Sequence, residues 1–243
     1  MPIFKYFLMI IILACIGCKS KPSTSFEGVQ PHGDIIATAT FPKVTNQKTI
    51  TYSNQGLPPT PDSTFVDLRN YSTDFVYDIK YATDDNFLKA KVYDCAECFL
   101  RHSTIQALLE AQKDFISIGY RIKIFDCYRP LDIQKKMWKL LQDPRYVANP
   151  AKGSIHNRGA AVDLTLVDAN GNELDMGTAF DHFGPESGID NKNLSKVVQD
   201  NRMLLQLVMR KHGFTVLKSE WWHFDHASAS NYTVSNFKWD CPN

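Results

Sequence analysis

The chain has 243 residues, of which 44% are hydrophobic and 12% aromatic, enough to bury one sizeable core but not two full domains. Its 27 basic and 26 acidic side chains leave a formal net charge of +1, so we expect no cationic surface of the kind that binds nucleic acid. Composition therefore predicts a single folded domain. It excludes nucleic acid as a partner, and nothing in the sequence predicts a protein partner.

Residues 1–18 have the pattern of a lipoprotein-type signal peptide. A lysine precedes the apolar run 7–16, which is too short to span a bilayer as a stable helix and is typical of a signal-peptide core. Gly17 followed by Cys18 resembles a bacterial lipobox, in which the cysteine is lipidated and becomes the mature N-terminus. Cys15 offers a competing box, and an ordinary cleaved secretory signal is a further alternative. We expect an exported periplasmic or cell-envelope lipoprotein, held on a membrane through a lipid anchor at Cys18.

Residues 19–63 read as a flexible exported tether. They contain six of the twelve prolines, many Ser, Thr, Gly and Asn residues, and no sustained apolar period. The catalytic domain is therefore expected over residues 64–243.

Four cysteines follow the tether, at positions 95, 98, 127 and 241. An even number in an oxidising compartment favours disulfides, although four cysteines allow three pairings among which the sequence cannot choose. Cys95-Ala-Glu-Cys98 could instead be half of a zinc knuckle or a redox motif. No second Cys or His pair follows at finger spacing, so we interpret all four as structural.

The first half of the domain alternates between strand and helix patterns. Apolar and polar residues alternate over 75–81 and again over 120–126, which predicts two strands. Between them, Ser103 and Gln106 form a capping-box pattern before a helical apolar period that ends at Gly119. Pro130 then opens a second predicted helix that runs to about Gln142.

The second half contains three further strands and a third helix. Alternation over 161–167 predicts a strand, residues 168–172 a hairpin turn, and the apolar period over 194–211 a helix before Gly213. Residues 214–216 and 221–224 return to strand patterns. Because helices and strands do not strictly alternate, we predict an α+β domain with a mainly antiparallel sheet flanked by helices.

Two stretches carry ligand-type side chains. Imidazole and carboxylate groups are usual ligands of Zn²⁺, and a catalytic zinc takes three protein ligands; His156, Asp163 and His223 would make such a set. Glu220 is left over, as a separate general base would be. Glu220 and His223 stand three apart, which on a flat strand sends them to opposite faces, so we expect a bulge or turn near Trp221. Taken singly, each residue could equally be a hydrogen-bonded structural group.

These stretches resemble the motifs of a known family. They read Ser154-x-His156-x-x-Gly159-x-Ala161-x-Asp163, Glu220-x-x-His223, Asp126-Cys-Tyr-Arg-Pro130 and Met176-Gly-Thr-Ala-Phe-Asp181. In this order they resemble the D-alanyl-D-alanine dipeptidase family, the VanX-type relatives of the zinc DD-carboxypeptidases, over about residues 65–225. The resemblance implies the zinc DD-peptidase, or Hedgehog-like, fold for a single catalytic domain.

The resemblance also implies roles for individual residues. One zinc ion per chain would be bound by the His156, Asp163 and His223 side chains. Glu220 corresponds to the family's general base and Arg129 to its transition-state arginine. Ser154 and Asp181 correspond to positions that hold the carboxylate end and the amino end of the substrate. Cys127 departs from the family, where glycine is common.

The implied function is hydrolysis of the small dipeptide D-alanyl-D-alanine to two D-alanines in cell-wall peptide turnover. One alternative is a DD- or LD-carboxypeptidase or endopeptidase on murein stem peptides, with the same zinc and glutamate. Another is a non-catalytic cell-wall binding module that keeps the fold as a scaffold. The presence of Glu220 and Arg129 is evidence against this last hypothesis, because a binding module needs neither a general base nor a group that stabilises an oxyanion.

Overall fold

A computed structural model describes residues 60–242 of the chain. The predicted signal peptide with Cys18 and nearly all of the predicted tether therefore lie outside the described residues. Among the helices of this part of the chain, none has both the length and the apolar character needed to cross a bilayer.

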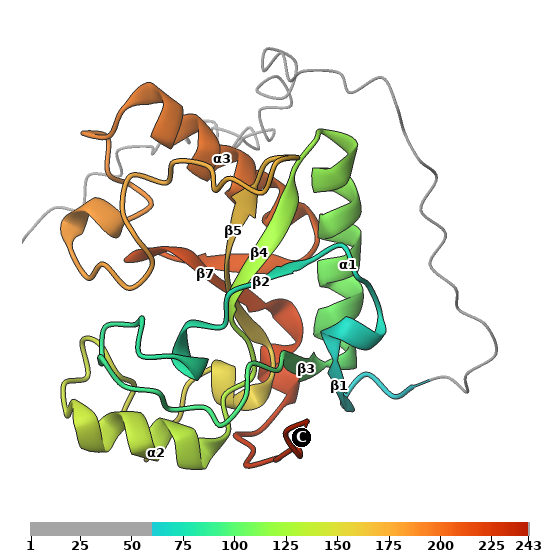
Figure 1. Ribbon diagram of the computed structural model, residues 1–243, viewed down its shortest axis with the longest axis vertical. Helices are drawn as coiled ribbons and strands as arrows, with labels where there is room; N and C mark the ends of the chain where they lie inside the picture. The colour runs from blue at the N-terminus through green and yellow to red at the C-terminus, as the bar shows by residue number, and fades with distance from the viewer. Residues whose placement is uncertain (1–59, 243) are drawn as a thin grey trace, which may run out of the picture. The chain divides into compact units, whose positions relative to one another are not determined.

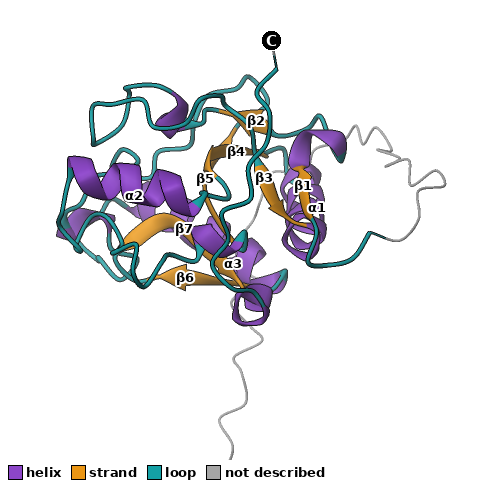
Figure 2. Ribbon diagram, turned by 90° about the horizontal axis from the view of Figure 1, so that it is seen from below, coloured by secondary structure: helices purple, strands orange, loops and turns teal. Residues whose placement is uncertain are grey.

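The domain is built on a five-stranded sheet (Figures 1 and 2). Its strands run in the order β2 (Val76–Tyr77), β4 (Arg121–Asp126), β5 (Ala161–Val167), β7 (Glu220–His226) and β6 (Phe214–Leu217). Only β2 and β4 pair in parallel; the other three pairs are antiparallel. A two-stranded antiparallel sheet of β1 (Phe65–Asp67) and β3 (Phe99–Arg101) lies beside it. The predicted α+β class with a mainly antiparallel sheet is confirmed.

Three α-helices accompany the sheet in the described part of the chain: α1 (His102–Ser117), α2 (Leu131–Leu140) and α3 (Lys196–Lys211). Helix α1 packs on β4 and α3 on β6, and the two helices contact each other, whereas α2 lies apart from both (Figure 1). The apolar side chains that defined the predicted helical period of α1, such as Ile105 and Leu108, are fully buried. All three predicted helices are present.

The capping box predicted for α1 is wrong. The residue that precedes the helix is Arg101, and it makes no side-chain cap. Ser103 already lies inside the first turn, and its hydroxyl is 2.8 Å from that of Tyr232 near the C-terminus. The serine therefore ties the helix to a distant segment of the chain instead of capping its own turn.

The strand predicted over 75–81 is much shorter than expected. Only β2 forms, and the chain then turns through a 3-10 helix, Lys80–Ala82, that buries Tyr81. The hairpin turn predicted after β5 is present, with the amide of Asp168 donating to the carbonyl of Asn172 (2.9 Å). Beyond this turn the return strand is reduced to a single bridge between Val167 and Glu173.

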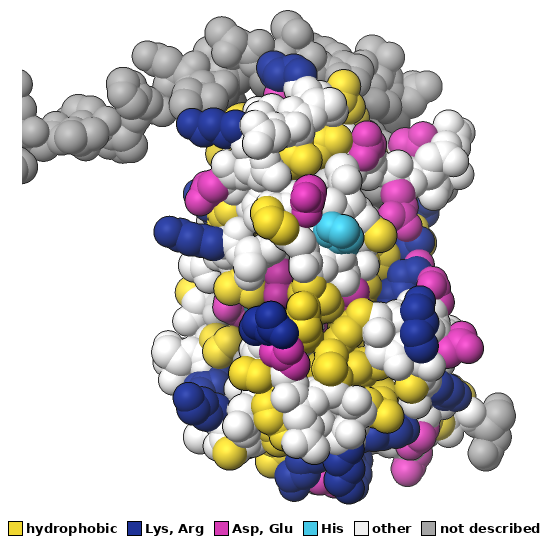
Figure 3. Space-filling model, turned by 90° about the vertical axis from the view of Figure 1, so that its left-hand side faces the viewer, with side chains coloured by type: hydrophobic (Ala, Val, Ile, Leu, Met, Phe, Trp, Pro, Cys, Tyr) yellow, Lys and Arg dark blue, Asp and Glu magenta, His cyan; other side chains and the backbone are white. Residues whose placement is uncertain are grey.

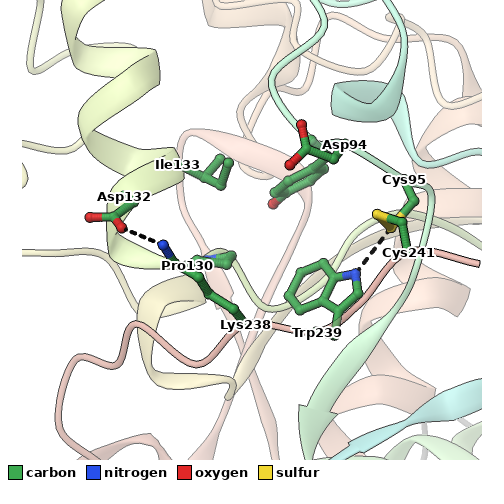
Figure 4. A pocket seen from close by; sticks show the side chains of 9 residues that line it. Asp94, Cys95, Pro130, Asp132, Ile133, Lys238, Trp239 and Cys241 are labelled. Atoms are coloured by element: carbon green, nitrogen blue, oxygen red, sulfur yellow. Dashed lines mark hydrogen bonds and ion pairs between the residues drawn. A yellow bond between two sulfur atoms is a disulfide. The ribbon is translucent and has the colours of Figure 1, made fainter.

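All four cysteines predicted to be structural form disulfides, and the pairing that the sequence left open is Cys95–Cys241 and Cys98–Cys127. The first ties the C-terminal segment to the loop before β3 (Figure 4). In the same place, the Trp239 indole donates to the Cys95 sulfur (3.2 Å) and Lys238 pairs with Asp132 at the start of α2 (2.9 Å). The C-terminal segment is thereby fastened across the loop that leads from β4 into α2.

Replacing Cys98 and Cys127 together by alanine should lower the free energy of unfolding by about 2 to 5 kcal/mol. The bond joins residues 29 apart in sequence, so its loss restores chain entropy to the unfolded state. Urea unfolding of the oxidised protein and of the double variant measures the difference. Equal midpoints and slopes for the two proteins would contradict a stabilising role.

Candidate metal centre and active site

Three predicted ligand residues meet at the centre of the sheet. His156 begins a short 3-10 helix, Asp163 lies on β5, and His223 lies on β7 directly opposite Asp163 in the strand register. The His156 Nε2 atom is 3.2 Å from His223 Nδ1 and 3.4 Å from Asp163 Oδ2, while His223 Nδ1 is 3.0 Å from Asp163 Oδ1. All three side chains are buried. These residues form the one group of three or more ligand-type side chains found among residues 60–242.

The spacing fits a tetrahedral metal ion. Nitrogen and oxygen ligands at about 2.0 to 2.2 Å from a tetrahedral zinc lie about 3.3 to 3.6 Å from one another. The shortest separations found here are close to this, the two to Asp163 being to different carboxylate oxygens. The Nδ1 atom of His156 is 2.8 Å from the Cys127 carbonyl oxygen. Because a carbonyl only accepts, Nδ1 carries the hydrogen and Nε2 keeps its lone pair for a metal. The buried cluster therefore has the ligand atoms and the spacing to hold a metal ion.

The carboxylates of Asp163 and Asp225 favour a positive charge at the cluster, whether a proton or a metal ion. Burial opposes protonation of His223, but the Asp163 and Asp225 carboxylates raise the pKa of this imidazole to about 10. Burial by itself would raise the pKa of Asp163, yet the adjacent histidines lower the pKa of this carboxyl below its usual range. A metal ion that binds here displaces a proton from His223, so metal binding should weaken as the pH falls.

A bulge in β7 brings Glu220 to the same site. Val216 pairs with Phe224, but the next residue of β6, Leu217, pairs with Glu220, so β7 contains three extra residues between the two pairs. The irregularity expected near Trp221 is confirmed, and Glu220 and His223 line the same cavity despite standing three apart. Burial, with Asp163 nearby, raises the pKa of Glu220, although the two histidines and Arg129 act in the opposite direction. A raised pKa suits a group that takes up a proton near neutral pH.

Arg129, three residues after the end of β4, is buried, and two hydrogen bonds hold its guanidinium group. One terminal nitrogen donates to Asp126 Oδ2 (2.6 Å) and the other to Gln134 Oε1 (3.0 Å). Its Nε–H is buried and finds no partner within the described residues. Burial disfavours the charge on Arg129, but Asp126 holds its pKa above the ordinary value. Arg129 is thus a fixed positive charge at the wall of the cavity.

The Asp126 carboxylate is itself fixed from the other side. Its Oδ1 accepts from the Tyr93 hydroxyl (2.7 Å) and from the Cys127 amide (3.0 Å), which leaves Oδ2 for Arg129. The main chain of Arg129 is held as well, because its amide donates to the carbonyl of His156 (3.1 Å). The loop that carries Arg129 and the turn that begins at His156, called the histidine turn below, are therefore joined by hydrogen bonds.

The two predicted substrate-binding residues both line the cavity. The Ser154 hydroxyl accepts from the His156 amide (3.2 Å), so this serine also shapes the histidine turn. Asp181 has a left-handed backbone (φ 60°) and accepts from the Tyr81 hydroxyl (3.0 Å). Burial, followed by the charge of Asp163, raises the pKa of Asp181 well above its usual range. A cationic group beside Asp181 would favour its charged form.

The cavity over the cluster has a volume of about 300 Å³, at the lower end of the range for small-molecule sites. Tyr146, from the loop after α2, and Phe183, from the segment between β5 and α3, line this cavity and contact each other with ring centroids 4.9 Å apart. Both segments lie on the left of Figure 1. Figure 3, seen from that side, shows hydrophobic side chains across the middle of this face with acidic side chains among them.

Sequence reasoning missed several residues of this site. Asp126 stood in a quoted motif, three residues before Arg129, and that spacing was the available signal for the ion pair. Four further residues reach the site from separate segments, and no local sequence pattern indicates a role for them: Tyr81, Gln134, Tyr146 and Phe183. His226, three residues after His223, is hydrogen-bonded with Ser228 (2.7 Å) and is not part of the cluster.

Comparisons with known proteins identify a family and several relatives of this chain. The family model described as D-ala-D-ala dipeptidase matches residues 62–240. A D-alanyl-D-alanine dipeptidase of Escherichia coli is 37% identical over 176 residues, which cover 72% of this chain and 91% of the relative. A protein of the same name from Enterococcus faecalis is 30% identical over 169 residues, covering 61% and 84% of the two chains.

Two solved structures are similar at a lower level. One is the vancomycin resistance D,D-pentapeptidase VanY in complex with Zn(II), with a TM-score of 0.35 and 13% identity over 55% of this chain and 78% of that chain. The other is the LD-carboxypeptidase LdcB, with a TM-score of 0.36 and 20% identity over 55% and 63% of the two chains.

Proposed function

The chain belongs to the D-Ala-D-Ala dipeptidase family of metallopeptidases, and from this we propose that it is a zinc enzyme that hydrolyses D-alanyl-D-alanine to two D-alanines in cell-wall peptide turnover. The observation that carries the proposal is the buried His156, Asp163 and His223 cluster, with Glu220 in the same cavity. One zinc ion per chain would be held by these three side chains.

The residues around the cluster supply the chemistry of peptide hydrolysis. Zinc, when bound, supplies a Lewis acid that polarises a carbonyl and lowers the pKa of water to about 7. Glu220 takes the proton of the attacking water and passes it to the leaving amine. Arg129 stabilises the negative charge that develops on the carbonyl oxygen, since its guanidinium is already clamped and needs no reorganisation.

A dipeptide would be oriented by its two charged ends. The buried Asp181 carboxyl receives the amino group, and the charge of that ammonium favours ionisation of Asp181 against the effect of burial. Ser154 binds at the carboxylate end. Glu220 and Arg129 also favour an enzyme over a binding module, because recognition alone needs neither a buried base nor a clamped arginine.

The size of the cavity favours a dipeptide over a murein stem peptide. With about 300 Å³ over the cluster and the Tyr146–Phe183 contact in its lining, little room is left for residues beyond the amino end. The zinc-loaded protein should therefore release D-alanine from D-Ala-D-Ala and leave stem pentapeptides intact. Chiral chromatography of free D-alanine measures both reactions. If the stem peptide is trimmed and the dipeptide is not, the carboxypeptidase function replaces this one.

We further propose that the protein acts outside the cytoplasm as a lipoprotein anchored through Cys18. The support is the short apolar run at 7–16 followed by Gly17 and Cys18. Mass spectrometry of the mature N-terminus should find Cys18 with two or three acyl chains, because one chain binds membranes only marginally. An unmodified N-terminus at another residue would exclude the anchor.

A further inference from the structure

We propose that Asp225 is a positioning residue for the metal site, which fixes the His223 ring so that its Nδ1 atom is the metal-binding nitrogen. The inference rests on the proposed function, since it assumes that the cluster binds zinc. Asp225 belongs to none of the motifs that point to the ligands and the base, and it adds no ligand to the cluster.

The contact is short and the backbone beneath it is fixed. Asp225 Oδ1 lies 2.9 Å from His223 Nε2. The two residues stand two apart on β7, so their side chains share one face of the sheet. Asp225 pairs with Ala161 on β5 and with Thr215 on β6, which places it between two neighbouring strands. The carboxylate is thus held against the ring by strand pairing on both sides.

This contact selects one form of the imidazole. A carboxylate only accepts hydrogen bonds, so the hydrogen of a neutral His223 ring lies on Nε2. The lone pair is then on Nδ1, the atom that faces Asp163 and His156 at 3.0 and 3.2 Å. Without Asp225 the ring could carry its hydrogen on Nδ1 or turn away from the cluster. Each of these states would have to be reversed before a metal binds.

The two histidines are therefore held by different means. His156 is oriented by a backbone carbonyl, that of Cys127, which no substitution removes. His223 is oriented by a side chain, and an anionic partner also makes the ring a stronger ligand. Asp225 is accordingly the point at which the outer part of the metal site can be tested by mutation.

Replacing Asp225 by alanine should weaken zinc binding about 10- to 100-fold, as is typical for loss of such a partner. Asp225→Asn keeps an accepting oxygen without the charge and should lose less affinity. Thr215→Val is the matched control: it removes a hydroxyl that donates to the backbone carbonyl of Asp225 (3.2 Å) and leaves the carboxylate in place. Zinc affinity is measured by competition with a fluorescent chelator. Thermal unfolding of the metal-free proteins reports on the fold.

The expected result is weaker zinc binding by Asp225→Ala, wild-type binding by Thr215→Val, and recovery of most Asp225→Ala activity when zinc is raised. A purely structural role would lower the unfolding temperature and would not be rescued by zinc. If Asp225→Ala does not fold, the affinity of Asp225→Leu, which also lacks an accepting oxygen, decides: a value equal to wild type overturns the inference. Wild-type affinity in Asp225→Ala overturns it too and leaves the proposed function intact. A wild-type protein that binds no zinc overturns both.

Discussion

Replacing His156, Asp163 or His223 by alanine should remove the bound zinc and the dipeptidase activity together. The three side chains approach one another to 3.0 to 3.4 Å, and two remaining ligands cannot complete the site. The loss of activity should be the largest of any single substitution, because it removes the Lewis acid itself. Metal content by mass spectrometry, measured beside D-alanine release, tests the expectation.

His226→Ala is the matched control for the ligand variants. His226 lies on the same strand as His223, three residues further on, but its ring contacts Ser228 and takes no part in the cluster. The control should bind one zinc ion per chain and keep its activity. A ligand variant that keeps stoichiometric zinc and full turnover would show that the cluster is a structural hydrogen-bond network and not a metal centre.

Replacing Glu220 by alanine should leave the zinc content unchanged and lower turnover by about 10² to 10⁴, the usual worth of a positioned general base. The three ligands remain in place, but no group takes the proton of the attacking water. The loss should appear mainly in kcat, because substrate binding uses other residues of the cavity. Glu220→Gln, which keeps the size of the side chain, should lose as much as Glu220→Ala.

The two Glu220 variants and the ligand variants together separate metal binding from proton transfer. Zinc titration and steady-state kinetics on D-Ala-D-Ala are measured on the same preparations. Hydrolysis by Glu220→Gln at the wild-type rate would rule out this glutamate as the base. Loss of zinc from Glu220→Ala would instead assign Glu220 to the ligand set.

The sequence predicted that His156, Asp163, His223 and Glu220 form one site from their residue types and from the ordered motifs that resemble one family. Within each pair the residues are close in sequence, but the two pairs meet because β5 and β7 are neighbours in the sheet. Residue type and spacing then limit the chemistry to a few possibilities. The helices were predictable for a similar reason, because their apolar periods are long and end near Gly119 and Gly213. The roles of His156, Asp163, His223 and Glu220 in binding and catalysis remain predictions.

The tertiary structure alone decided what depends on contacts between distant segments. Separate parts of the chain are joined by the disulfide of Cys98 with Cys127, the hydrogen bond of Arg129 to Gln134, and the Tyr146–Phe183 contact in the cavity lining. Ser103 does not form the predicted cap, and its hydroxyl is instead hydrogen-bonded with that of Tyr232, far along the chain. Local propensity carries no information about such partners, which arise only when strand register and loop paths bring segments together.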